Sequence, residues 1–160
     1  MFNVQNAKLI CFNMLTRLED LKLVAYKDSK GIWTIAIGIT KVNGKPIYKG
    51  MTCTKEEAIK WCYEYMDSDI IELSNWCNDN NIDLKDNQAA SILSFTYNAG
   101  FSAFKKSSMA KEIINNNFEL AAKAFEKWDK IRINDNLVFS KGLFNRRMKE
   151  EQCFIDEDAC

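Results

Sequence analysis

Two carboxylates and one hydroxyl near the N-terminus form the pattern with the clearest chemical meaning in this sequence. Glu19 and Asp28 stand nine residues apart, and Thr34 follows six residues after Asp28. Two carboxyl groups in different environments can cleave a glycosidic bond, because one keeps its proton while the other stays ionised. Since the chain has 22 acidic residues, such a spacing also arises between ordinary surface charges, and the spacing alone is a weak signal.

The local sequence places these three side chains on different elements. Residues 4–18 carry apolar side chains at helical spacing, so Glu19 is predicted to end the first helix. The negative end of a helix and burial in a cleft both favour the protonated carboxyl of Glu19. Asp28 begins a predicted turn, where backbone amides and solvent favour its ionised form. Thr34 follows on a strand and can hold a water molecule that Asp28 activates.

The rest of the pattern predicts a small sheet followed by helices. Residues 22–47 have two or three short antiparallel strands with turns at 28–31 and 43–44. Thr54 and Glu57 match a capping box that begins a helix running to about residue 78. Further helices are predicted at residues 87–98, 107–115, 118–128 and 141–154. The predicted fold class is therefore α+β.

We expect one domain over residues 1–160, divided into two lobes. The sheet-bearing lobe covers about residues 15–50, a connecting helix covers 54–79, and a larger helical lobe covers 80–155. The length and the 47% hydrophobic content suit a single globular domain with a sizeable core. The chain is expected to be a monomer.

Composition disfavours several classes of protein. The formal net charge is zero, which gives no support to a nucleic-acid partner. No apolar run is long enough to span a membrane and no export signal precedes the first helix, so no stable membrane insertion is expected. Histidine is absent and no C-x-x-C pair occurs, so a zinc site has little support and neither metal nor cofactor is predicted.

The six cysteines leave the redox state open. In a reducing cytosol most of them would be small buried apolar residues. Cys62 and Cys77 share helical spacing with apolar neighbours, which fits this interpretation. Cys160 is terminal and is expected to be free, although a disulfide in an oxidising compartment stays open.

Three blocks of sequence extend the pattern around Glu19. The first contains Glu19, Ala25-Tyr26-Lys27-Asp28, Gly31-Ile32-Trp33-Thr34-Ile35 and Gly38-Ile39-Thr40. The second contains Asn87-Gln88, residues 94–100 and residues 104–108, and the third is residues 142–147 followed by Glu150. In content and order these blocks resemble the phage-type lysozymes, the T4-like and lambdoid endolysins of glycoside hydrolase family 24.

The resemblance implies a lysozyme-like fold with a cleft between its lobes. It also implies inverting hydrolysis of the β-1,4 bond between N-acetylmuramic acid and N-acetylglucosamine in bacterial peptidoglycan. By position, Glu19 is the general acid, Asp28 positions or activates the water, and Thr34 binds that water. The same resemblance implies an endolysin for host cell lysis, held in the bacterial cytoplasm until a holin pore releases it to the wall.

Three further residues are expected at the cleft through the same resemblance. Tyr97 and Asn98 should face the cleft from the helical lobe and bind substrate, although core packing is an equal alternative for Tyr97. Arg146 should lie near Glu19, with Arg147 as the alternative. An ordinary surface position for Arg146 is equally consistent with the sequence.

The sequence departs from the family pattern at three positions. Asp20 stands where a glycine usually follows the acid, and would favour protonated Glu19 if it pointed inward. Ala36 replaces a glycine, so a methyl group could enter the cleft floor, and Ile39 replaces a common histidine. These changes bear on substrate range and rate more than on the reaction.

Other classes of protein remain to be weighed against this interpretation. One is a degenerate lysozyme that binds wall glycan without cutting it, which the presence of Glu19, Asp28 and Thr34 disfavours. Another is a lytic transglycosylase, which needs one Glu and would be separated from a hydrolase by its anhydro product. A zinc amidase or peptidase is disfavoured because the chain has no histidine.

Overall fold

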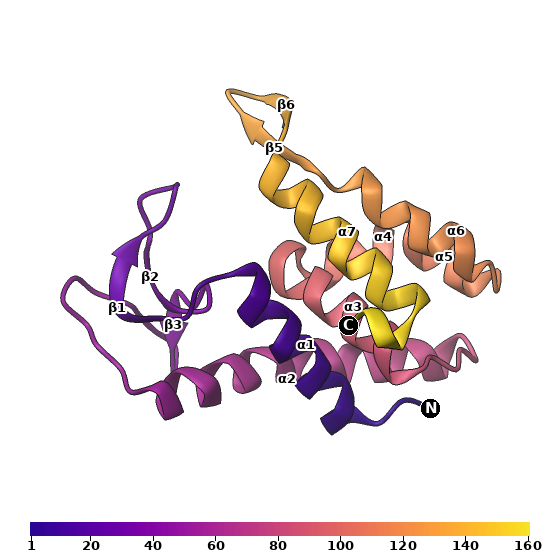
Figure 1. The fold of residues 1–160 in the computed structure, drawn as a ribbon, viewed down its shortest axis with the longest axis horizontal. Helices are drawn as coiled ribbons and strands as arrows, with labels where there is room; N and C mark the ends of the chain where they lie inside the picture. Colours follow the sequence, from indigo (N-terminus) through magenta and orange to yellow (C-terminus); the bar gives the residue numbers. More distant parts are fainter.

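The computed structural model describes all 160 residues, and Figure 1 shows a small sheet-bearing part and a larger helical part joined along one long helix. The joining helix, α2 (Lys55–Asp79), begins beneath the strands and ends beneath the helical lobe. Both chain termini lie in the helical lobe (Figure 1). No helix combines the length and the apolar character that crossing a membrane requires.

The first helix, α1 (Val4–Leu18), has the predicted bounds. Its N-cap Asn3 accepts a hydrogen bond from the Asn6 N–H at 2.9 Å. At the other end the Glu19 N–H donates to the Leu15 carbonyl at 2.8 Å, and Glu19 itself is extended, with φ −132° and ψ 144°. Glu19 is therefore the residue at which the chain leaves the helix for the sheet lobe.

The sheet lobe consists of two separate ladders rather than one sheet of two or three strands. β1 (Lys22–Lys27) pairs antiparallel with β2 (Trp33–Ala36), and β3 (Lys41–Val42) pairs with β4 (Lys45–Pro46). Ala36 and Gly38 have positive φ angles of 57° and 65°, which turn the chain away from β2. This bend prevents the following strand from extending the first ladder.

α2 begins as predicted. The Glu57 N–H donates to the Thr54 hydroxyl at 3.1 Å, and the Thr54 N–H donates to the Glu57 carboxylate at 3.0 Å. The reciprocal pair satisfies two amides at the helix start. The two-residue turn at Asn43–Gly44, which joins β3 to β4, also forms, with both φ angles positive.

The helical lobe is built around α3 (Asp86–Ala99), which ends at Gly100 with φ 91°. Two short helices follow, α4 (Phe101–Lys106), which was not predicted, and α5 (Ser108–Ile114), capped by Ser107. The predicted helix at 118–128 is α6 (Phe118–Ala124) continued by the 3-10 turn η1 (Phe125–Lys127). The last elements are α7 (Lys141–Ile155) and the 3-10 turn η2 (Glu157–Ala159).

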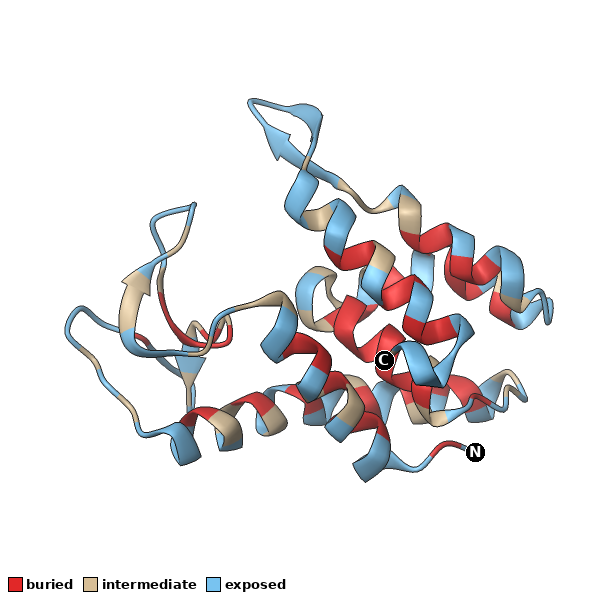
Figure 2. Ribbon diagram, in the orientation of Figure 1, coloured by how far each residue is buried: buried red, intermediate tan, exposed pale blue.

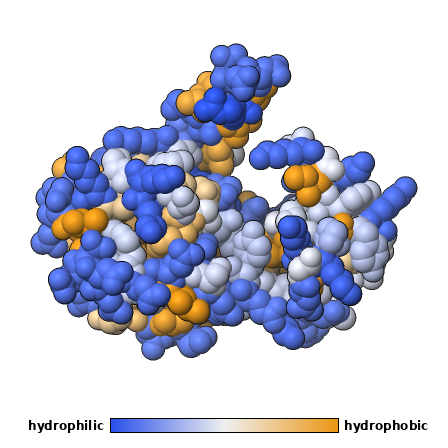
Figure 3. Space-filling view, turned by 180° about the vertical axis from the view of Figure 1, so that it is seen from behind, coloured by the Kyte–Doolittle hydropathy of each residue, from blue (hydrophilic) through white to orange (hydrophobic).

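Between η1 and α7 lies a hairpin that the sequence analysis did not assign. β5 (Lys130–Ile133) pairs with β6 (Asn136–Phe139) through a turn in which Asn134 and Asp135 have positive φ angles. A polar pair between two alternating runs is a hairpin signal, and it was present in the sequence. Every residue of both strands is exposed, and the hairpin projects beyond the body of the protein (Figures 1 and 3).

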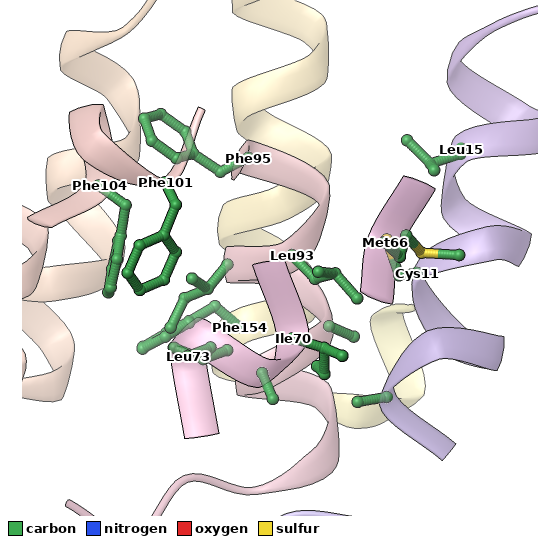
Figure 4. Packing of buried hydrophobic residues seen from close by; sticks show 14 of the residues in the cluster. Cys11, Leu15, Met66, Ile70, Leu73, Leu93, Phe95, Phe101, Phe104 and Phe154 are labelled. Atoms are coloured by element: carbon green, nitrogen blue, oxygen red, sulfur yellow. The ribbon is translucent and has the colours of Figure 1, made fainter. Parts of the chain in front are cut away.

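One hydrophobic core serves both lobes. Buried residues concentrate where α1, α2, α3 and α7 meet, and a further group lies beneath β2 (Figure 2). A single cluster of 32 buried residues includes Ile35, Ile37 and Ile39 of the sheet lobe together with the helical core. Figure 4 shows Leu93 and Phe95 of α3 among side chains from the surrounding helices. Because the core is continuous, the position of the sheet lobe relative to α3 is set by packing.

Four of the six cysteines have free thiols, of which Cys53 is half-buried, and the other two form a disulfide. Cys11, Cys62 and Cys77 are buried in the core, as predicted for small apolar residues. The expectation that Cys160 is free is wrong, because it forms a disulfide with Cys153 of α7. The turn η2 brings the C-terminus back along the helix, so that the two Cα atoms lie 4.5 Å apart.

Candidate active site

A cleft of about 840 Å³ opens between the end of α1 and the first half of α7. Arg17, Arg146 and Lys149 contribute three positive charges to its lining, against the single carboxylate of Glu19. Such a surface attracts ligands that carry carboxylates. Further polar and apolar side chains of the lining are Asn98, Ser140, Leu143, Phe144, Asn145, Met148 and Gln152.

Glu19 holds its carboxylate between the two lobes. Its side chain is 37% exposed, and Oε2 accepts a hydrogen bond from Arg146 Nη1 at 3.1 Å. The other oxygen, Oε1, lies so close to Gly38 that a Cβ atom added there would be 3.6 Å away. Glu19 is thus held by an ion pair with Arg146 on one side and by the backbone at Gly38 on the other.

Arg146 is held in the protein interior. Its side chain is 6% exposed, so a surface position is ruled out. Besides Glu19 it contacts α3, where Nη2 donates to the Ser94 carbonyl at 2.9 Å, and its Nε lies 3.7 Å from Glu150 Oε2. The structure thus places Arg146, and not Arg147, beside Glu19.

Asn98 lies exposed on the cleft at the end of α3, oriented by Arg147. The side-chain oxygen Oδ1 of Asn98 accepts a hydrogen bond from Arg147 Nη2. A guanidinium can only donate, so the NH₂ group of Asn98 is left free to donate into the cleft. Arg147 also donates from Nε to the Trp128 carbonyl at 3.0 Å and lies 4.7 Å above the Phe95 ring.

Asp28 occupies the turn between β1 and β2, as predicted. One carboxylate oxygen accepts hydrogen bonds from the Lys30 N–H at 2.8 Å and the Ile32 N–H at 2.9 Å. These two hydrogen bonds fix the orientation of the carboxylate in the turn. The Thr34 hydroxyl, almost fully buried on β2, donates to the Ile32 carbonyl at 2.9 Å. Toward a water molecule it therefore offers only acceptor lone pairs.

Asp28 and Thr34 do not line the 840 Å³ cleft. Tyr26, on the same hairpin, lies near both Thr34 and Glu19, because it pairs with Thr34 and is affected by the charge of Glu19. Tyr26 pairs with Thr34 across the hairpin. Its pKa is raised, first by burial and then by the negative charges of Glu19 and Asp28. The Tyr26 ring therefore lies within electrostatic reach of both carboxylates.

Tyr97 does not line the 840 Å³ cleft but packs against the core, which is the second of the two positions considered for it from the sequence. Its hydroxyl donates to the Ile37 carbonyl and lies 3.7 Å from Cys62 Sγ, and its ring packs edge-on against Tyr65. Burial raises the pKa of Tyr97. Tyr97 thus connects α3 to the loop just before Gly38, the loop against which Glu19 rests.

The three departures from the family pattern lie away from the cleft. Asp20 is exposed and its carboxylate is 3.5 Å from Lys22 Nζ, so it does not point inward at Glu19. The methyl group of Ala36 is buried in the core instead of the cleft floor. Ile39 is likewise a core residue.

We expect Asp20→Asn to leave the pH dependence of activity unchanged. The Asp20 side chain is 87% exposed, so water and salt screen its charge from the cleft. The measurement is the pH profile of kcat/KM for both proteins at 0.15 M salt. A displaced acid or alkaline limb would show that Asp20 acts on Glu19 despite its exposure.

Thr34→Val should lower turnover about tenfold or more, while the hairpin stays folded. Valine has the shape of threonine but lacks the acceptor for a water molecule, and tenfold in rate corresponds to about 1.4 kcal/mol of lost interaction. The lost hydrogen bond to Ile32 should cost about 1 kcal/mol of unfolding free energy. Thr34→Ser, which keeps the hydroxyl, is the matched control. Equal turnover in Thr34→Val and Thr34→Ser would show that the hydroxyl takes no part in the reaction.

A small sheet lobe and a larger helical lobe joined by a long helix, with a carboxylate at a helix end between them, define the lysozyme-like class of fold. Residues 16–150 match the family model described as phage lysozyme. The endolysin of Salmonella phage P22 is 33% identical over 153 residues, which cover 91% of this chain and 97% of that protein.

Solved structures give the same result. An endolysin from Escherichia coli O157:H7 phage FAHEc1 superposes with a TM-score of 0.86 at 29% identity, over 92% of both chains. A mutant P22 lysozyme superposes with a TM-score of 0.72 at 31% identity, over 91% of this chain and 95% of the other. The chain belongs to the phage lysozyme family.

Glu150 was not given a role by the sequence analysis, and Arg147 was considered only as the alternative to Arg146. The signal lay in the third sequence block, where Arg146 and Arg147 precede Glu150 by four and three residues. On a helix these spacings place all three side chains together.

Proposed function

We propose that this protein is an endolysin that hydrolyses the β-1,4 bond between N-acetylmuramic acid and N-acetylglucosamine, with inversion. The observation that carries the proposal is the placement of Glu19 in a cationic cleft, held by Arg146 and resting against Gly38 of the sheet lobe, whose hairpin bears Asp28 and Thr34. Membership of the phage lysozyme family, whose members compared above are called endolysins or lysozymes, supports the same reaction.

In the proposed reaction Glu19 is the general acid. Its carboxyl proton passes to the glycosidic oxygen as the bond to the anomeric carbon breaks, and the sugar leaves as an alcohol. Asp28 accepts a proton from a water molecule that attacks the anomeric carbon from the opposite face, and Thr34 accepts a hydrogen bond from the same water. Two backbone amides hold Oδ1 of Asp28, which leaves Oδ2 to accept that proton.

Substrate binding is assigned to the helical side of the cleft. The free NH₂ of Asn98 suits a carbonyl acceptor such as an N-acetyl group. The cations of the lining suit the carboxylates of muramic acid and of the peptide stems. Arg146 contributes by holding Glu19, and Tyr97 contributes only through the loop that it supports.

We further propose that residues 1–160 act as one monomeric lysozyme-like unit that needs neither metal nor cofactor. Its substrate is the bacterial wall and not nucleic acid. The endolysin would accumulate in the host cytoplasm and reach the wall through a holin pore, where cleavage of the glycan lyses the cell.

The products released from purified peptidoglycan test the proposal. Hydrolysis should give new reducing ends on N-acetylmuramic acid, and inversion should give the α-anomer first when digestion is followed by NMR. A β-anomer would indicate retention, and a 1,6-anhydro end without a reducing end would indicate a transglycosylase. Wall binding with neither product would support a glycan-binding module instead.

A further inference from the structure

We infer that Glu150 is a positioning residue that controls both Glu19 and Asn98, acting through Arg146 and Arg147. The inference rests on the proposed function, because it concerns how the general acid of that reaction is held. Glu150 does not line the cleft and is fully buried. It therefore acts on substrate only through the residues that it contacts.

Glu150 is shared between two buried arginines on its own helix. Its Oε1 accepts a hydrogen bond from Arg147 Nη1, and its Oε2 lies 3.7 Å from Arg146 Nε. The side chains of Arg146 and Arg147 are 6% and 1% exposed. Buried charges of this kind are stable only when paired. Glu150 is the only carboxylate paired with Arg147, whereas Arg146 is shared between Glu150 and Glu19.

On one side this arrangement aims Arg146 at the general acid. The guanidinium is planar, so contacts to two of its nitrogens fix the direction of the third. Arg146 has Nε toward Glu150 and Nη2 on the Ser94 carbonyl, which leaves Nη1 directed at Glu19 Oε2. On the other side, Arg147 has Nη1 on Glu150 and Nε on the Trp128 carbonyl, which directs Nη2 at Asn98.

The charge of Glu150 matters as well as its shape. Without Glu150, two guanidinium charges in one buried cluster would attract the Glu19 carboxylate with no opposing charge behind them. The negative charge of Glu150 offsets part of that attraction. Burial raises the pKa of Glu150 while Arg147 and Arg146 oppose it, and we take it as ionised because a neutral Glu150 would leave the buried Arg147 without a carboxylate partner.

The other titratable groups around this cluster are uncharged near neutral pH. The Ser94 hydroxyl and the Cys11 thiol accompany Glu150, and burial raises the pKa of Cys11. Three groups face Glu19 from other elements, and burial raises the pKa of each; they are Tyr26 of β1, Cys62 of α2 and Tyr97 of α3. The buried charged groups that act on Glu19 from the helical lobe are therefore Arg146, Arg147 and Glu150, and the cations Arg17 and Lys149 line the cleft itself.

The test is the pH profile of kcat/KM on a soluble peptidoglycan fragment. Glu150→Gln removes a negative charge, so the alkaline limb, where the general acid loses its proton, should move to lower pH by roughly one unit. Arg147→Met removes a positive charge, so the same limb should move to higher pH. Arg147→Met should also raise KM about fivefold, because Asn98 loses its orientation and with it about one hydrogen bond to the substrate.

The double variant Glu150→Gln/Arg147→Met restores the net charge of the cluster. Its alkaline limb should return close to that of the wild type, while the raised KM persists. Glu150→Asp keeps the charge and should leave the limb in place. Glu151→Gln is the matched control, because Glu151 is the next residue on α7 and is paired with Lys123 outside the cluster.

A purely structural role for Glu150 predicts lower activity without limb shifts of opposite sign. The inference would be overturned if the alkaline limb of the pH profile did not move in either variant. It would also be overturned if the limb moved in the same direction in Glu150→Gln and Arg147→Met. If Glu150→Gln does not fold, Arg147→Met and Glu150→Asp decide the question by the same criterion. If Glu19→Gln keeps full activity, the proposed function fails, whereas loss of activity in Glu19→Gln with unmoved limbs overturns the role of Glu150 alone.

Discussion

Glu19→Gln is expected to lower kcat on purified peptidoglycan by about 1,000-fold, within the range that general acid catalysis contributes. An amide has no proton to give to the leaving oxygen. The glutamine carbonyl oxygen can still accept the hydrogen bond from Arg146 Nη1, so the side chain should keep its place between Arg146 and Gly38. The measurement is the rate of reducing-end release at saturating substrate.

Binding and stability separate loss of the acid from loss of structure. Glu19→Gln should still sediment with peptidoglycan, and its unfolding free energy should change by no more than about 1 kcal/mol, because the carboxylate is partly exposed. Asp20→Asn, which changes a neighbouring carboxylate outside the cleft, is the matched control and should be fully active. If Glu19→Gln retained a tenth of the wild-type rate, another group would have to supply the proton.

The second large effect is expected for Asp28→Asn, which should lower kcat by about 100-fold or more. The asparagine oxygen can accept the same two backbone N–H groups, from Lys30 and Ile32, so the turn should keep its conformation. An amide cannot accept a proton from the attacking water at neutral pH. Turnover of the variant should therefore fall without a matching loss of wall binding.

Two further measurements define what Asp28 does. Azide is a nucleophile that needs no base, so it should restore cleavage by Asp28→Asn and form a glycosyl azide. Attack from the face opposite the leaving group gives the α-glycosyl azide, and attack from the same face gives the β-glycosyl azide. In an inverting enzyme the α-glycosyl azide is expected. Asp135→Asn, in the turn of the exposed hairpin β5–β6, is the matched control and should leave kcat unchanged. Normal turnover by Asp28→Asn would refute the base assignment.

Local patterns in the sequence were sufficient for the elements that carry the proposed catalytic groups. The bounds of α1, the capping box at Thr54 and the turn at Asp28 all depend on residues within a few positions of each other. Hydrogen bonds between near neighbours decide these features, and such bonds form in the same way wherever the segment is placed. Glu19 at a helix end and Asp28 in a turn could therefore be predicted without tertiary information.

Contacts between distant segments could not be predicted in this way. Consecutive residues on a helix point about 100° apart, so the choice between Arg146 and Arg147 as the partner of Glu19 depends on the rotation of α7. The same argument separates Tyr97, which supports a loop, from Asn98, which lies on the cleft. The rotation of each helix is fixed by its packing in the shared core.

The sequence by itself therefore determined the family, the order of the elements and the candidate acid, base and water-binding residue. Only the tertiary structure decided which arginine reaches Glu19, that Cys160 is paired with Cys153, and that Glu150 joins two arginines behind the cleft. The physical reason is the distance along the chain between the residues whose interactions decide each feature. Helix ends and turns are set by neighbouring residues, whereas the burial and pairing of a charged side chain depend on every element packed around it.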